Sequence, residues 1–127
     1  MRLTVRMNAL RNSLSQRLRD LAVEERAWPG RDDGFASLLF DGQEFAHFHT
    51  WSEIDIRLGK DAIKRERLMH PVDSKVHPGR SKNSPWYEMT ILSAADVDEA
   101  VRLVRVAIQE LRGAKPIQLR ARRSRTK

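Results

Sequence analysis

The chain has 127 residues, with 24 lysines and arginines against 17 aspartates and glutamates, and it contains no cysteine. This length is typical of a single domain that buries one hydrophobic core. The lack of cysteine excludes disulfide bonds, thiolate zinc sites and a cysteine nucleophile. No apolar run approaches the roughly 20 residues that cross a bilayer, and the N-terminus lacks the apolar stretch of a secretory signal. We therefore expect a cytoplasmic protein with no membrane partner.

The net charge of +7 is concentrated near the two ends of the sequence. Residues 115–127 carry six basic residues and no acidic one, and residues 1–19 carry five arginines and no acidic one. Residues 20–114 are left with 13 basic and 17 acidic residues, a net charge of −4. We predict one domain over residues 1–113, followed by a basic, disordered tail over residues 114–127. The composition of residues 1–19 is also shared by mitochondrial presequences, an alternative that the sequence leaves open.

The first predicted element is an amphipathic helix over residues 5–22. Its leucines recur at the spacing of one helical face, which predicts that the helix packs on the core and is retained. The segment Trp28-Pro29-Gly30 is typical of a turn and ends this first part of the domain. The leucines of the stripe are Leu10, Leu14, Leu18 and Leu21.

Three strands are predicted next. Residues 35–40 and 43–51 are both strand-like, and the Asp41-Gly42 pair between them favours a type I′ hairpin turn, because both central residues of that turn need a positive φ. Residues 53–58 alternate between apolar and charged side chains, which indicates a half-buried third strand. One side of the sheet is therefore expected to be polar.

A short helix and a further strand follow. Residues 60–69 are good helix formers, and Pro71 is expected to end their helix. Residues 72–85 are rich in proline, glycine, serine and lysine, which favours a loop with a brief strand at 75–77. Residues 86–92 alternate again and predict another strand.

The last predicted element is a helix that begins after Ser93. Asp96 follows this serine at the spacing of a capping box, with aspartate in place of the usual glutamate. Gly113 stands where a helix-ending glycine is expected, and Pro116 follows it. The helix presents an apolar stripe of Val97, Val101, Val104, Ile108 and Leu111.

Together these elements predict an α+β fold: an N-terminal helix, an antiparallel sheet of about four to five strands with a short inserted helix, and a C-terminal helix packed on one sheet face. In this order the sequence resembles the small bacterial luciferase-domain family. The resemblance rests on five features in sequence: Trp28-Pro29-Gly30, the stretch Gly42-Gln-Glu-Phe-Ala-His-Phe-His49, His77, Pro85-Trp86 and the helix from Asp96 to Leu111.

The resemblance covers residues 8 to 112 and implies the fold but no activity. The layout is also similar to that of the YjbR-like proteins, whose double-wing motif is suspected of binding DNA. A likeness at the level of the fold is weak evidence for function.

Two histidines dominate the candidate site. His47 and His49 are two residues apart on a predicted strand, so both imidazoles should lie on one face of the sheet. Strict alternation places Phe45 and Trp51 on the same face.

The sequence allows three interpretations of this histidine pair. The imidazoles could bind zinc with a third ligand from His77, Glu44 or Asp55, although no fixed metal-binding spacing is present. They could be structural and hydrogen-bonded to neighbouring backbone. With His77 and Trp86, at positions that the resembling family fills in the same way, they could line a pocket for an anionic or aromatic ligand.

Three functions remain open. The leading hypothesis is a non-catalytic binding module for an unknown small molecule, with His47, His49, His77 and Trp86 as its site and no catalytic residue, metal or cofactor assigned. The second hypothesis is a nucleic-acid-binding accessory protein that uses the first helix and the tail. The tail residues of that hypothesis are Arg120, Arg122, Arg123, Arg125 and Lys127. The third hypothesis is a small enzyme that is metal-dependent or uses a histidine as general acid or base.

Overall fold

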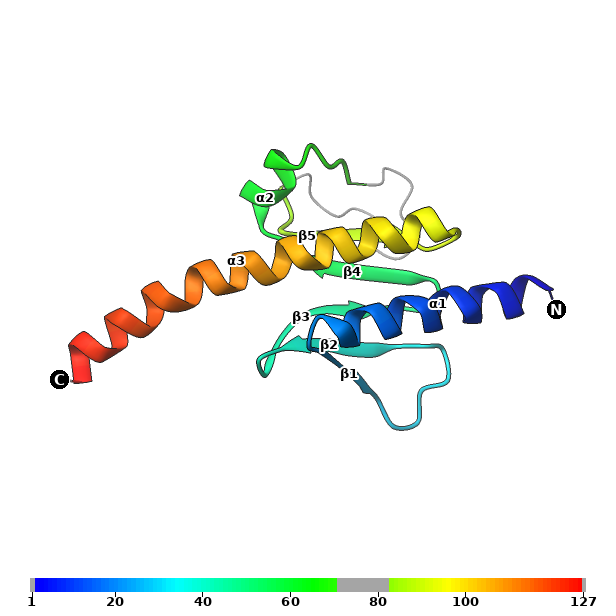
Figure 1. Ribbon diagram of the computed structural model, residues 1–127, viewed down its shortest axis with the longest axis horizontal. Coiled ribbons are helices and arrows are strands. Elements are labelled where there is room, and N and C mark those ends of the chain that lie inside the picture. The colour runs from blue at the N-terminus through cyan, green and yellow to red at the C-terminus, as the bar shows by residue number, and fades with distance from the viewer. Residues whose placement is uncertain (1, 71–82, 127) are drawn as a thin grey trace.

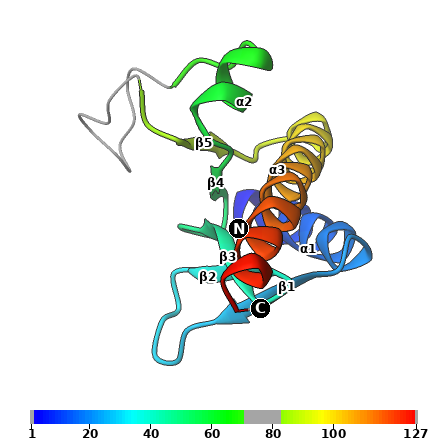
Figure 2. The same ribbon diagram turned by 90° about the vertical axis from the view of Figure 1, so that its left-hand side faces the viewer.

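The structure, a computed structural model, describes residues 2–70 and 83–126, with the backbone alone for residues 2–4 and 114–126. A five-stranded antiparallel sheet has its strands in chain order, and two long helices lie on one face of it (Figures 1 and 2). The predicted α+β fold is confirmed. Its elements are α1 (Arg2–Asp20), β1 (Val23–Ala27), β2 (Ala36–Phe40), β3 (Gln43–Phe48), β4 (Glu53–Arg57), α2 (Lys60–Arg65), β5 (Trp86–Thr90) and α3 (Ala94–Thr126).

The predicted hairpin joins β2 and β3. Asp41 and Gly42 form its turn with φ of 55° and 79°, so both central residues have the positive φ that a type I′ turn requires. β4 and β5 follow the predicted alternation, with Ile54 and Ile56 fully buried against the helices. The short sequence signals therefore predicted four of the five strands.

The remaining strand, β1, was not predicted. Among the described strands it lies at the edge of the sheet, paired with β2. Its sequence, Val23-Glu-Glu-Arg-Ala27, has a single large apolar residue, so it shows no alternation. Charged side chains are common on edge strands because they discourage pairing with another chain. Here the tertiary pairing overrides the weak local preference.

β3 contains an irregularity that sequence alternation did not predict. Leu38 pairs with Ala46 while Leu39 pairs with Glu44, so Phe45 is the extra residue of a β-bulge. The bulge shifts the alternation by one residue. Phe45 therefore joins Ala46 in the buried core, and the prediction that it shares a face with the histidines is wrong.

α2 is shorter than predicted, because it ends at Arg65 and not near Pro71. Arg67 adopts a left-handed conformation with φ of 57°. Its N–H donates to the carbonyl of Lys64, and the N–H of Leu68 donates to the carbonyl of Ile63. This pair of bonds is a Schellman motif, with arginine in the position that glycine usually fills.

α3 begins as predicted and ends later. The N–H of Asp96 donates to Ser93 Oγ, and the Asp96 carboxylate accepts a hydrogen bond from the N–H of Leu92. Gly113 does not adopt the left-handed conformation of a helix-ending glycine, so the backbone continues as a helix to Thr126 and projects past the sheet (Figure 1). The assignment of residues 114–127 to a tail outside the domain stays a prediction.

The core lies between the sheet and the helices α1 and α3. Leu14 and Leu18 of α1 are fully buried, so the first helix is an integral part of the domain, as its leucine stripe predicted. On α3, Val101 and Val104 are buried against the same sheet face. Burial of side chains of this size contributes about 1.5–3 kcal/mol each.

A buried arginine joins α1 to the sheet. Arg11 is 5% exposed, and its guanidinium donates to the Glu25 carboxylate on β1 over 3.1 Å and to the Thr50 carbonyl over 3.3 Å. The same group packs 3.5 Å above the ring of Phe48. Burial lowers the pKa of Arg11, and the neighbouring Glu25 carboxylate opposes that shift. Ser15 donates a second hydrogen bond to Glu25, over 2.6 Å.

We predict that Arg11→Met lowers the free energy of unfolding by about 2–4 kcal/mol, because it leaves the part-buried Glu25 carboxylate without its cationic partner. The matched control is Arg17→Met on the same helix, where the ion pair with Asp98 is exposed. That change should cost about 1 kcal/mol or less. Urea unfolding measures both. Equal decreases in the free energy of unfolding would show that the buried Arg11 contacts stabilise the fold no more than the exposed ion pair of Arg17 does.

Candidate functional site

A row of polar side chains crosses the sheet on the face opposite α1 and α3. Ser37, His47, Asp55 and Glu88 lie on four neighbouring strands and pair directly with one another in register. Side chains of directly paired residues emerge on the same face. We call this side of the sheet, defined by these four residues, the polar face. Three of the four side chains are nevertheless buried, since Ser37, Asp55 and Glu88 are 4%, 2% and 8% exposed.

Aromatic rings lie around the central member of this row. The Phe35 ring stacks on the His47 imidazole with 5.4 Å between ring centres and 24° between planes. The Trp86 ring lies 5.4 Å from the same imidazole, and the His49 ring lies 6.1 Å from it. His47 is thus the centre of a cluster of rings that comes from β3, β5 and the loop before β2.

A carboxylate approaches the same imidazole. Asp55 Oδ2 lies 3.6 Å from His47 Nε2, a distance longer than a hydrogen bond but short enough for an ion pair when the imidazole is protonated. A histidine beside a carboxylate is also the arrangement that general acid–base catalysis uses. The geometry alone assigns no reaction.

The loop between β1 and β2 holds Phe35 in place. Trp28 Nε1 donates to Ser37 Oγ over 2.9 Å, which ties the loop to the polar row. Asp33 accepts hydrogen bonds from the Arg31 guanidinium and from the N–H of Phe35. The hydrogen bond from Arg31 is the main reason why the pKa of Asp33 is lowered to about 2. The Arg31 guanidinium also lies 4.4 Å from the centre of the Phe35 ring.

Gly34 allows this loop to lie close to the turn after β3. Its φ is +89°, and a Cβ added there would lie 2.6 Å from the backbone nitrogen of Trp51 and 2.9 Å from the indole Cδ2. The Arg11 guanidinium also lies near this residue, 5.2 Å from the centre of the Trp51 ring. Close backbone approach and a positive φ both require glycine at this position.

The structure brings together three of the four residues predicted for the site. His47, His49 and Trp86 lie in one cluster, whereas His77 lies outside the described residues. Phe35 belongs to the same cluster and was not predicted as a site residue. Phe35 lies two residues before Ser37, and residues at that spacing on a strand share a face, but only the pairing of Ser37 with His47 in the structure shows that this is the face of the site.

Some site predictions stay untested. Within the described part of the chain, no group of three or more histidine and acidic side chains could hold a metal ion. The side chains of Arg120, Arg122, Arg123 and Arg125, and all of Lys127, lie outside the described residues, so the nucleic-acid hypothesis stays a prediction.

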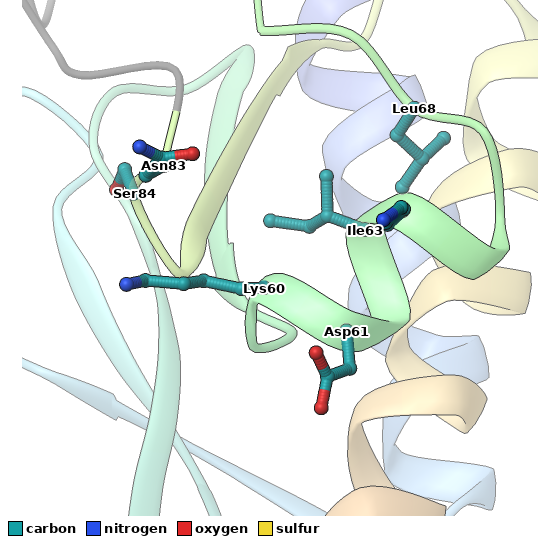
Figure 3. A pocket seen from close by; sticks show the side chains of 7 residues that line it. Lys60, Asp61, Ile63, Leu68, Asn83 and Ser84 are labelled. Carbon is teal, nitrogen blue, oxygen red and sulfur yellow. The ribbon is translucent and has the colours of Figure 1, made fainter.

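In the described part of the chain, surface cavities lie away from the ring cluster. One, of about 310 Å³, lies beside α2 and is lined by residues of that helix together with Leu68, Asn83 and Ser84 (Figure 3). A second, of about 360 Å³, lies between Leu21 and the Arg105–Arg112 segment of α3. A third, of about 180 Å³, lies between Arg17 of α1 and α3. None of these three includes a residue of the polar row.

Comparison with known proteins identifies the family. A family model described as the luciferase domain matches residues 42–107, more than half of the chain. The chain belongs to the luciferase-domain family. No curated protein and no solved structure gives a significant match. The similarity in layout to the YjbR-like proteins therefore stays a prediction.

The luciferase-domain match covers most of the polar face. It includes His47, Asp55, Trp86 and Glu88, which belong to β3, β4 and β5. Phe35 precedes the matched segment, so this ring comes from the part of the chain outside the family model. Among the described residues, no helix has both the length and the apolar character needed to cross a membrane. The expected cytoplasmic location stays a prediction.

We predict that Gly34→Ala destabilises this luciferase-domain protein by about 2 kcal/mol or more, because the added methyl group must displace Trp51 in addition to straining a positive φ. Gly30→Ala in the same loop is the control. Its φ is +80° and a Cβ there meets nothing within 4 Å, so only the backbone strain of about 1 kcal/mol should appear. Thermal unfolding measures the difference in stability between the two variants. Equal melting temperatures would contradict the close contact between Gly34 and Trp51.

Proposed function

We propose that the polar face is the binding site for a small molecule with a planar ring, and that the protein acts there as a binding module. The observation that supports this most is the arrangement around His47, whose imidazole lies 5.4 Å from both the Phe35 and the Trp86 rings. Stacked and tilted rings at 4.5–7 Å are the geometry in which aromatic groups attract one another. A planar ligand ring would be attracted to the cluster by the same interaction.

The polar row beneath the rings supports the same proposal. Binding sites for small molecules combine apolar and aromatic walls with a few polar groups that fix the orientation of the ligand. Phe35 and Trp86 supply the walls. Ser37, Asp55 and Glu88 supply oxygen atoms on β2, β4 and β5, and such rigid elements hold their side chains more precisely than loops do.

The position of the site within the family adds further support. His47, His49 and Trp86 all lie in the segment that matches the luciferase domain. The aromatic and polar groups of the face therefore lie mainly on the part of the fold that defines the family. Phe35 and the half-exposed Trp28 would adapt this common face to a particular ligand.

We expect indole to bind at the polar face and to shift the side-chain NMR signals of Trp86 and His47. Trp86→Leu should weaken this binding by about two- to tenfold, because an aromatic pair contributes about 0.5–1.5 kcal/mol. Tyr87→Leu is the matched control, because Tyr87 is the next residue on β5 and its ring lies on the opposite face of the sheet, against the core. Titration by NMR provides the dissociation constants. If indole shifts only signals beside α2 or α3, the proposed site is wrong.

A further inference from the structure

We propose that the cavity between Leu21 and α3 binds an amphiphilic carboxylate, whose charged group pairs with Arg112 and whose apolar chain lies on Leu21 and Ile108. The cavity has a volume of about 360 Å³ and is also lined by Arg105 and Gln109. It is separate from the polar face, so this inference does not depend on the function proposed there.

Most of the described lining of this cavity comes from one face of one helix. Ile108, Gln109 and Arg112 follow Arg105 by three, four and seven residues, which is the spacing of neighbours on a helix surface. Leu21 comes directly after the last residue of α1. The cavity therefore lies where the end of α1 meets the surface of α3.

The floor of the cavity is apolar and fixed by the core. Ile108 is 6% exposed and belongs to the core cluster, and Leu21 is a partly buried side chain that packs against the same cluster. Transfer of an alkyl chain from water onto such a surface is favourable in proportion to the apolar area that it covers. The floor therefore favours a ligand with an apolar chain over a small, fully hydrated ion.

Arg112 provides an oriented cation beside this floor. Its guanidinium lies 5.3 Å from the centre of the Phe40 ring on β2, a distance at which a cation and a ring face attract each other. A guanidinium that stacks on a ring keeps the N–H groups at its edge for hydrogen bonds, and their fork matches the two oxygens of a carboxylate. A group that is already oriented loses less conformational freedom on binding. We therefore assign the carboxylate of the ligand to Arg112.

The charges of its lining distinguish this cavity from the other two. The cavity beside α2 is lined by Asp61 in addition to two lysines, and the third cavity includes Asp98, which pairs with Arg17. The described residues that line the cavity at Leu21 include two arginines and no acidic residue. A concave surface of one charge sign with apolar walls concentrates its electric field on the ligand. Arg105 therefore strengthens the preference for an anion.

Three probes test the charge and the chain of the ligand separately. We expect octanoate, below the concentration at which it forms micelles, to bind the full chain at least about tenfold more tightly than octylammonium, because the arginines attract the anion and repel the cation. Octanoate should also bind at least about tenfold more tightly than acetate, which lacks the chain. NMR titration measures the dissociation constants, and shifts of the Leu21 and Ile108 methyl signals show that binding occurs in this cavity.

Arginine variants assign the preference to its source. Arg112→Gln should weaken octanoate binding by about fivefold or more, because it removes the partner of the carboxylate, and should change the binding of neutral octanol by less than about twofold. Arg102→Gln is the matched control, since it removes the same charge from an exposed position of the same helix outside the lining of this cavity. If Arg112→Gln does not fold, Arg105→Gln carries the test, with an expected loss of about twofold or more.

Four results would overturn the proposal. Equal affinities for octanoate and octylammonium would contradict the charge of the ligand, and equal affinities for octanoate and acetate would contradict the apolar contact. Octanoate that leaves the Leu21 and Ile108 signals unshifted would bind elsewhere or not at all. Equal losses of octanoate affinity in Arg112→Gln and Arg102→Gln would assign the effect to the net charge of the protein and not to Arg112.

Discussion

The arrangement of the candidate site depends on a buried arginine on the other side of the sheet. Arg11 joins α1 to Glu25 on β1 and packs close to Trp51 in the turn after β3. Trp51 in turn contacts Gly34, whose missing side chain allows the loop before β2 to approach the turn. Phe35, the next residue, then reaches the His47 imidazole. A single chain of contacts therefore links the packing of the first helix to the ring cluster.

The two faces of the sheet are buried by different means. On one face the apolar stripes of α1 and α3 cover Ile54 and Ile56, as in most α+β domains. On the polar face, Asp55 is buried beside histidine and aromatic rings. Burial of a charged group costs free energy unless partners compensate for it, and proteins keep such groups mainly where they are needed. The polar face is therefore where the function of this luciferase-domain protein is expected.

Sequence patterns predicted the fold well and the site only in part. The Asp41-Gly42 turn and the apolar stripes of the helices are local signals, so they could be interpreted without tertiary information. β1 was missed because an edge strand needs no alternation, and the bulge at Phe45 was missed because it arises from pairing between two strands. The meeting of Phe35 with His47 depends on the same strand register, which no short motif encodes.

The most direct test of the polar face as a binding site is a crystal structure of the full chain with indole. We predict that the indole ring lies against Trp86 or Phe35 beside His47. Indole bound only in the cavity beside α2, or not bound at all, would contradict the account as a whole.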